Sequence, residues 1–275
     1  MTPLQAVREV ARELGEAGVP SPRVDAEHLV SHVLGLTRSQ LYAADAALDE
    51  GDSGRLRALV ERRRGREPLA YVLGEWGFRR LTLAVDARAL VPRPETEVVV
   101  ERCLAHLAGL EAPRVLDVGV GSGAIALAIA DEHPGASVVA VERSEGALAL
   151  ARENLARTGL EARVTLVRGR LLDGVAGPFD LVVSNPPYVS AAEYESLQPE
   201  IRLFEPREAV VGDGVWEPIA ARARGVLAPG GRLVLECGDS QADGVAAGLR
   251  ELGYEDVLAT PDLAGRPRVV EGRRP

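Results

Sequence analysis

Four consecutive residues, Asn185-Pro186-Pro187-Tyr188, carry the chemistry for which the chain is best equipped. They follow a short apolar run, residues 179–184, that is typical of a buried strand. Two prolines end that strand, because proline has no N–H and holds the residue before it extended. The Asn185 amide, the Pro186 carbonyl and the Tyr188 ring are therefore predicted at the carboxyl edge of a sheet, where open α/β sheets bind ligands. The alternative is a proline-rich turn without a function.

A glycine-rich segment at residues 114–124 suggests a cofactor site. Its sequence, R-V-L-D-V-G-V-G-S-G-A, predicts a strand, a tight turn and the start of a helix. A dinucleotide fingerprint is a possible reading of the same letters. However, an acid two residues before the first glycine suits a cationic amino group, such as that of S-adenosylmethionine, better than a pyrophosphate. The loop residues predicted to bind the cofactor are Asp117, Gly119, Val120, Gly121, Ser122 and Gly123.

Glu142 ends the next predicted strand, 21 residues after Gly121. An acid at this place can accept hydrogen bonds from both hydroxyls of a ribose. Nicotinamide cofactors and S-adenosylmethionine both carry a ribose, so Glu142 predicts a nucleoside-containing cofactor without deciding between them. The alternative is a surface glutamate that happens to follow a strand.

Composition sets limits on these predictions. The chain has 275 residues, of which 46% are hydrophobic and 27% charged, so it is globular and long enough for one large domain or two. Its net charge of −9 gives no global field that would favour nucleic acid. Cys103 and Cys237 have no metal-ligand spacing, and we expect no metal and no disulfide. Without a signal core or a long apolar run, a soluble cytoplasmic protein is expected.

The residue usage is biased in an informative way. The chain has no lysine, so all 32 basic residues are arginines, and it has only two asparagines, Asn154 and Asn185. We interpret this as base-composition bias in the coding sequence. A drifting position would then more readily hold Ala, Arg or Gly, which adds weight to Asn185.

The first 66 residues are predicted to form a small helical domain. Apolar residues recur at helical spacing, and Ser21 with Pro22 can begin a second helix. A fourth helix at about 53–65 carries most of an arginine run that extends to Arg66. Such a run is more often a solvated helix face than a docking surface, although both interpretations remain open.

Residues 67–94 are predicted to form a β-hairpin linker with strands at 69–74 and 81–85. From residue 113 on, strands and helices alternate, which predicts a mostly parallel sheet covered by helices on both faces. A helix is expected at 95–110, with an acidic first turn. The strands are predicted at 114–118, 137–142, 163–167, 179–184, 232–237, 254–260 and 267–272, and the later helices at 122–132, 144–158, 215–228 and 240–252.

The glycine loop at 117–123, the acid at 142 and N-P-P-Y at 185–188 resemble class I S-adenosylmethionine-dependent methyltransferases that act on planar amide or amine nitrogens. Within that class the chain resembles the HemK/PrmC family of protein-glutamine methyltransferases. The closer resemblance rests on R-E-P-L-A-Y at 66–71, V-P-R-P-E-T-E at 91–97, R-L-F-E-P at 202–206 and D-L-A-G at 262–265.

The resemblance implies a fold, a domain plan and a substrate. The fold is the α/β class I methyltransferase fold, with a mostly parallel seven-stranded sheet. Residues 1–66 would be a substrate-docking helical domain, 67–94 the linker and 95–275 the methyltransferase domain. The substrate would be the glutamine of the GGQ loop in class I peptide chain release factors, and neither a membrane nor nucleic acid would be a direct partner.

The resemblance also implies roles for individual residues. The catalytic residues would be Asn185, Pro186 and Tyr188. The substrate would contact Asn185, Pro186, Pro187, Tyr188 and Arg93, and the cofactor would also contact Leu171 and Asn185. One position departs from the family: Arg170 stands where an acid commonly accepts the adenine amine, and arginine cannot accept a hydrogen bond. A backbone carbonyl or a water would then read the amine.

Two other functions compete with this prediction. A nucleic-acid methyltransferase could place the exocyclic amine of a base in the same N-P-P-Y pocket. Such enzymes usually present a strongly basic surface, whereas residues 1–90 carry 13 arginines against 13 acids. A nicotinamide-dependent oxidoreductase or a non-catalytic nucleotide-binding module is the third possibility.

Overall fold

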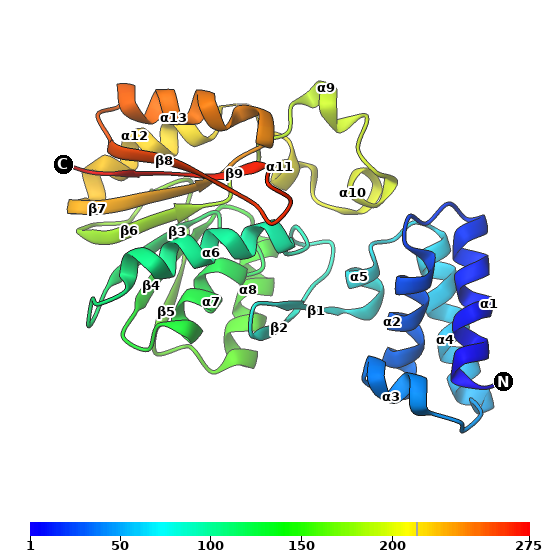
Figure 1. Ribbon diagram of the computed structural model, residues 1–275. Helices are drawn as coiled ribbons and strands as arrows, with labels where there is room; N and C mark the ends of the chain where they lie inside the picture. The colour runs from blue at the N-terminus through cyan, green and yellow to red at the C-terminus, as the bar shows by residue number, and fades with distance from the viewer. Residues whose placement is uncertain (213) are drawn as a thin grey trace. The chain divides into compact units, whose positions relative to one another are not determined.

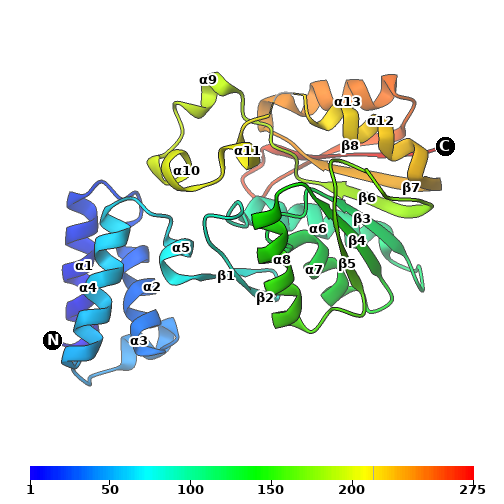
Figure 2. The ribbon, with the colours of Figure 1, turned by 180° about the vertical axis from the view of Figure 1, so that it is seen from behind.

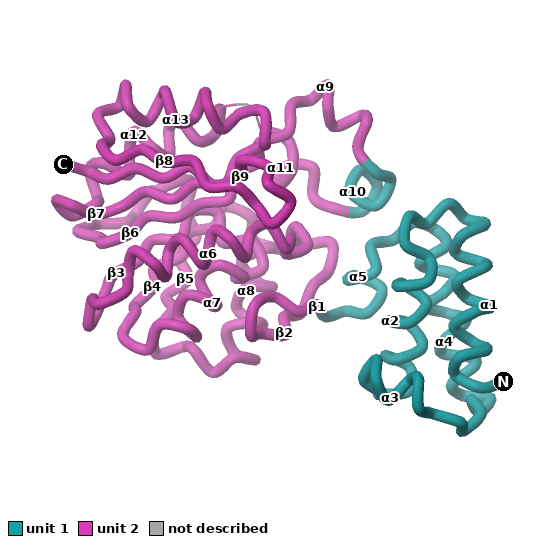
Figure 3. Tube along the Cα trace, in the orientation of Figure 1, with its two compact units in different colours: residues 1–75, 198–204 teal, residues 76–197, 205–275 magenta. Residues whose placement is uncertain are grey.

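The computed structural model describes residues 1–212 and 214–275, which form two compact units (Figure 3). Unit 1 contains Met1–Glu75 together with Gln198–Phe204. Unit 2 contains Trp76–Leu197 and Glu205–Pro275. The sequence placed Gln198–Phe204 within the methyltransferase segment, whereas in the structure these residues cluster with the helical unit.

Unit 1 is a bundle of helices around its own apolar core (Figure 1). The fully buried side chains of Leu14, Leu29 and Leu41 lie at its centre. Thr2 caps the first helix through a reciprocal hydrogen-bonded box with Gln5, as its sequence position favours. The helices are α1 (Pro3–Glu16), α2 (Pro22–Leu34), α3 (Arg38–Ala43), α4 (Glu50–Arg64), α5 (Leu69–Leu73) and α10 (Pro199–Phe204).

One arginine of the run on α4, Arg63, is buried inside unit 1, so the run is not a purely solvated face; Arg55, Arg57, Arg62 and Arg64 are exposed. Arg63 is 4% exposed and donates to Asp25 at 2.7 Å and to Glu200 at 2.9 Å. Arg66 donates to both carboxylate oxygens of Glu200, at 2.8 and 2.7 Å. Buried guanidinium groups require such partners. These ion pairs attach α10 to the helical bundle.

The strand predicted at 69–74 is wrong, because Leu69–Leu73 forms helix α5. A five-residue apolar run is compatible with either a helix or a strand. Gly74 adopts a left-handed conformation with φ of 76° and ends the helix, while Tyr71 and Val72 are buried. The linker hairpin is built instead from β1 (Glu75–Phe78) and β2 (Leu81–Ala84), the second of which confirms the prediction.

Unit 2 is built on a seven-stranded sheet with the strand order β5-β4-β3-β6-β7-β9-β8. The first five strands in this order run parallel, and β9 is antiparallel to both β7 and β8. This confirms the predicted fold class. The strands are β3 (Arg114–Val118), β4 (Ser137–Glu142), β5 (Val164–Arg168), β6 (Phe179–Ser184), β7 (Leu227–Glu236), β8 (Glu255–Pro261) and β9 (Pro267–Arg273).

Helices cover both faces of this sheet and enclose two apolar cores (Figure 1). One face carries α6 (Pro94–Leu107), α7 (Ala124–Glu132) and α8 (Glu145–Thr158), and the other carries α12 (Trp216–Val226) and α13 (Ala242–Glu251). The small sheet of β1 and β2 lies beside α8 (Figure 2).

Short helices follow β6 and β7; the sequence analysis expected no regular structure at 191–194 and 207–210, whereas 239–241 overlaps the start of the helix predicted at 240–252. They are α9 (Ala191–Tyr194), α11 (Arg207–Val210) and the 3₁₀ turn η1 (Asp239–Gln241). Among the helices of residues 1–212 and 214–275, none is long and apolar enough to cross a membrane. The parallel strands β3, β4 and β6 leave the sheet at the same edge, where their following loops meet.

Candidate active site

A cavity of about 420 Å³ opens at the carboxyl edge of the sheet in unit 2. It brings together most of the residues that the sequence predicted for cofactor and substrate. Three predicted residues, Asp117, Gly123 and Tyr188, do not line it. The predicted residues that do are Arg93, Gly119, Val120, Gly121, Ser122, Glu142, Leu171, Asn185, Pro186 and Pro187.

The glycine loop and Glu142 form one wall of this cavity. Gly121 has φ of 56°, and a Cβ built on it would meet no atom within 4 Å, so this position opens into free space. The Glu142 carboxylate accepts hydrogen bonds from the backbone N–H of Gly121 at 3.0 Å and of Ser144 at 2.8 Å. A carboxylate has about four lone-pair sites, so Glu142 is held in place and can still accept from a ligand.

Asp117 lies at the end of β3, and its neighbours Val118 and Gly119 line the cavity. The carboxylate is 1% exposed; one oxygen accepts from Ala126 N at 3.1 Å, and the other has no hydrogen-bond partner among the described residues. Burial raises the pKa of Asp117 to about 7. An unpartnered buried carboxylate oxygen beside a cavity indicates a place for a cationic ligand group.

Asn185 follows β6 and is oriented by a side chain from another element. Its Nδ2 donates to the hydroxyl of Thr96 at 3.3 Å, and Thr96 is buried in the first turn of α6. The preceding Ser184 donates to the carbonyl of Val118 at 2.6 Å and so ties β6 to β3. Thr96 was not predicted as a site residue, although it belongs to the V-P-R-P-E-T-E stretch.

Tyr188 lines a second cavity, of about 330 Å³, together with Glu236. Pro186 and Pro187 line both cavities and form the wall between them. The Tyr188 hydroxyl donates to Glu236 at 3.4 Å, and its backbone carbonyl accepts from Gln241 at 2.8 Å. Burial raises the pKa of Tyr188, so the phenol stays protonated.

Arg93 lines the first cavity and forms an ion pair with Glu205, whose side chain is 1% exposed. This contact joins two residues of unit 2 that are 112 positions apart in the sequence. Burial raises the pKa of Glu205, and the charge of Arg93 opposes that rise. The guanidinium of Arg93 therefore holds Glu205 beside the cavity, which the next residue, Pro206, also lines.

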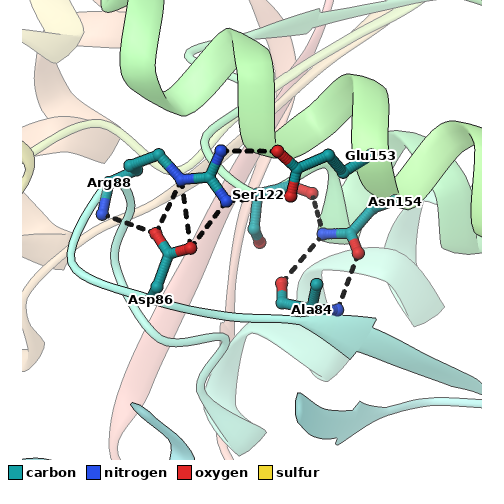
Figure 4. Close-up of polar contacts among 6 residues, drawn as sticks. All are labelled: Ala84, Asp86, Arg88, Ser122, Glu153 and Asn154. Carbon is teal, nitrogen blue, oxygen red and sulfur yellow. Dashed lines mark hydrogen bonds and ion pairs between the residues drawn. The ribbon is translucent and has the colours of Figure 1, made fainter. Parts of the chain in front are cut away.

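Asn154 is a structural residue of the site for which the sequence analysis proposed no role. Its side chain is fully buried on α8 and bridges β2 to the glycine loop (Figure 4). The oxygen accepts from Ala84 N at 2.7 Å, and Nδ2 donates to the carbonyls of Ala84 at 3.0 Å and Ser122 at 2.9 Å. The scarcity of asparagine in the chain was the signal that could have revealed it.

Comparison with known proteins agrees with this geometry. The PrmC N-terminal domain family matches residues 5–74, and the Methyltransferase small domain family matches residues 96–242. The release factor glutamine methyltransferase of Deinococcus radiodurans is 46% identical, covering 97% of this chain and 96% of that protein. The protein of the same name from Geobacter sulfurreducens is 45% identical, with 94% and 92% covered. A solved methyltransferase structure from Pyrococcus furiosus, 20% identical with a TM-score of 0.51, covers 81% of this chain and 98% of its own and has the same type of fold.

Proposed function

The chain belongs to the release factor glutamine methyltransferase family, and from that premise we propose that it transfers a methyl group from S-adenosylmethionine to a glutamine side-chain amide nitrogen in a peptide chain release factor. The observation that carries this proposal is that the glycine loop, Glu142 and Asn185 line a single cavity. A methyl donor on the loop and an amide at Asn185 would then be neighbours. The protein would act in the cytoplasm, where such a substrate takes part in translation.

The residues of the cavity fit S-adenosylmethionine. Glu142 would accept the ribose hydroxyls, and the unpartnered oxygen of Asp117 would attract the amino group. Leu171 lines the cavity and would cover one face of the adenine. When bound, this cofactor supplies an electrophilic methyl group on a sulfonium. Arg170 also lines the cavity and cannot accept from the adenine amine, so that amine would be read by another group.

The acceptor side of the cavity suits a primary amide. An amide nitrogen is a poor nucleophile because its lone pair is delocalised into the carbonyl. The side-chain oxygen of Asn185 and the carbonyl of Pro186 would each accept one N–H of the substrate, which fixes the amide plane and directs the nitrogen lone pair toward the methyl group. Tyr188 lines the second cavity, behind Pro186 and Pro187, so it would support this loop through its contact with Glu236 rather than touch the substrate. As the nitrogen–carbon bond forms, the bond between the methyl group and the sulfonium sulfur would break, which leaves S-adenosylhomocysteine, and one amide proton would go to water.

The decisive experiment follows tritiated methyl groups from S-adenosylmethionine into a purified class I release factor, total RNA and DNA in parallel. We expect label in the release factor alone, and none after the glutamine of its GGQ loop is replaced by asparagine. Label in RNA or DNA would instead identify a nucleic-acid amino-methyltransferase, and label in none of the three would contradict the proposal.

A further inference from the structure

Three side chains form a hydrogen-bonded row between the two cavities: Thr96 and Asn185 line the active-site cavity, and Glu236 lines the second one. The Thr96 hydroxyl lies 2.7 Å from a carboxylate oxygen of Glu236, and Asn185 Nδ2 lies 3.3 Å from the same hydroxyl. Strands β6 and β7 pair in parallel with Ser184 opposite Leu235. Asn185 and Glu236 therefore leave the sheet side by side, and the first turn of α6 bridges them.

The hydrogen atoms of this row can be assigned by elimination. A threonine hydroxyl has one hydrogen, and an ionised carboxylate can only accept, so Thr96 donates to Glu236. The Thr96 oxygen then faces Asn185 as an acceptor. Only the NH₂ end of the Asn185 amide can satisfy it, which leaves the amide oxygen directed away from Thr96.

We infer that Glu236 and Thr96 are positioning residues that fix which end of the Asn185 amide is available to the substrate. This inference rests on the proposed function, in which the Asn185 oxygen accepts an N–H of the substrate glutamine. If the Asn185 amide were reversed, its NH₂ would face the NH₂ of the substrate, and two donors cannot form a hydrogen bond. The reversed amide is therefore inactive, although it occupies the same volume.

The surroundings of Glu236 shift the pKa of its carboxyl, so the protonation state of Glu236 can control the hydrogen bonds of this row. The carboxyl is 1% exposed, and burial raises its pKa to about 7, opposed by the Thr96 hydrogen bond. Arg268 and the Tyr188 hydroxyl also favour the charged form, whereas the carboxylate of Glu95 disfavours it. Cys237 is the next residue along the chain, and its thiol stays protonated because burial raises its pKa to about 11.

Protonation of Glu236 would allow the hydrogen bonds of the row to reverse their direction. A protonated carboxyl can donate to Thr96, whose own hydrogen is then free to point at Asn185. The amide of Asn185 would turn its oxygen to that donor and present its NH₂ to the substrate. Methyl transfer is therefore expected to fall as the pH drops through about 7.

The first test compares Thr96→Val with Thr96→Ser. Valine keeps the shape but removes the hydroxyl, so kcat with release factor should fall by about 10–100-fold. Serine keeps the hydroxyl and should restore most of kcat. Calorimetric affinity for S-adenosylhomocysteine should be unchanged in both variants, because neither residue type alters the glycine loop.

The inference would be overturned by a Thr96→Val enzyme with wild-type kcat or by a Thr96→Ser enzyme as slow as Thr96→Val. Loss of cofactor affinity in Thr96→Val would also overturn it, because that loss would indicate a merely structural role for Thr96. Failure of the wild-type enzyme to methylate a release factor would instead contradict the proposed function. The two kinds of failure are therefore distinguishable.

The second test is the pH profile of kcat at saturating S-adenosylmethionine. The glutamine of Glu236→Gln cannot ionise, so the profile of this variant should lose the acidic limb that we expect for the wild-type enzyme at about pH 7. Cys237→Ala is the matched control, because Cys237 lines the second cavity beside Glu236 but takes no part in the hydrogen-bonded row. This variant should keep the acidic limb. An acidic limb retained by Glu236→Gln would overturn the inference.

Discussion

At the scale of single residues, Asn185 is unusual already in the sequence, because it is one of only two asparagines and stands directly before two prolines at the end of a strand. Its amide is held by Thr96 at 3.3 Å, so the acceptor geometry exists before any substrate binds. A preorganised acceptor of this kind contributes mainly to the transition state, because it needs no rearrangement during the reaction.

We expect Asn185→Ala to lower methyl transfer to release factor by about 10²–10³-fold, the usual effect of losing one oriented polar group. Affinity for S-adenosylhomocysteine should stay near the wild-type value, since the glycine loop and Glu142 are untouched. Single-turnover transfer and calorimetry measure the two effects separately. A variant that transfers methyl groups at the wild-type rate would show that Asn185 is not an acceptor for the substrate.

Gly121 sets the space available to the cofactor. Its φ of 56° is strained for any other residue, and a side chain there would project into the cavity of about 420 Å³. We expect Gly121→Arg to abolish cofactor binding by calorimetry. Gly54→Arg is a suitable control, because Gly54 lies on the exposed side of α4 and a Cβ there would meet no atom within 4 Å. Retained affinity in Gly121→Arg would refute this placement of the cofactor.

At the scale of elements, Asn154 connects three segments that must stay in register around the cofactor loop. It satisfies both backbone groups of Ala84 on β2 and the carbonyl of Ser122, from a fully buried place on α8 (Figure 4). Removal of the amide would leave these buried backbone groups without partners.

Asn154→Ala should therefore lower the free energy of unfolding by about 2–4 kcal/mol, measured by urea denaturation. Its neighbour Glu153 provides the control, because it pairs with Arg88 at the surface, where side chains are 52% and 34% exposed. Glu153→Gln should cost much less, because solvent screens an exposed ion pair. Equal losses in the two variants would mean that the Asn154 bridge contributes nothing specific.

The elements differ in how well local sequence predicts them. Six of the seven strands of the large sheet were predicted to within one residue at each end, because a short apolar run bounded by turn residues is a strong strand signal. The start of β7 was missed: it was predicted at residue 232 but lies at Leu227, before a Pro-Gly-Gly run at 229–231 that suggests a turn. Residues 69–73 were mistaken for a strand, since five apolar residues do not reveal a period and only the left-handed Gly74 marks a helix end. The α9 and α11 helices have four residues each, too few for periodicity to be visible.

The site residues differ in the same way: contiguous motifs could be predicted from the sequence, whereas contacts between distant positions could not. The N-P-P-Y stretch and the glycine loop are contiguous motifs, and their residues were predicted together. Thr96, Glu236 and Asn154 act through contacts between residues 32 to 140 positions apart. No spacing rule in one sequence connects such positions, so the folded chain is needed to show which of them meet.

At the scale of the whole molecule, the two units have separate cores and different contents. Unit 1 has the helical core, and unit 2 has the two cores of the sheet. Every residue that lines the cavity of about 420 Å³ belongs to unit 2. Both tryptophans of the chain, Trp76 and Trp216, also belong to unit 2. Tryptophan fluorescence therefore reports on the unit that contains the cofactor site.

Because the cavity and both tryptophans belong to unit 2, a cofactor-site ligand should raise the unfolding temperature of unit 2 in particular. A ligand that binds only the folded form stabilises it by about 2.7 kcal/mol at one hundred times its Kd. S-adenosylhomocysteine at that concentration should move the thermal transition seen by tryptophan fluorescence to higher temperature. The helices of unit 1 also contribute to the far-ultraviolet circular dichroism. The thermal transition seen by dichroism should therefore separate into two components, one moved to higher temperature by the ligand and one unchanged. This is possible because proteins with several cores need not unfold in one step.

Gly121→Arg provides the control for this experiment, since it should keep both transitions and lose only the ligand-dependent shift. A single dichroism transition that moves fully with the fluorescence would contradict the prediction and show that the units unfold together. The unshifted component can be assigned to unit 1 by a core substitution there. Leu29→Ala creates a cavity among fully buried side chains and should lower that transition selectively, because large-to-small changes in a core cost about 2–5 kcal/mol.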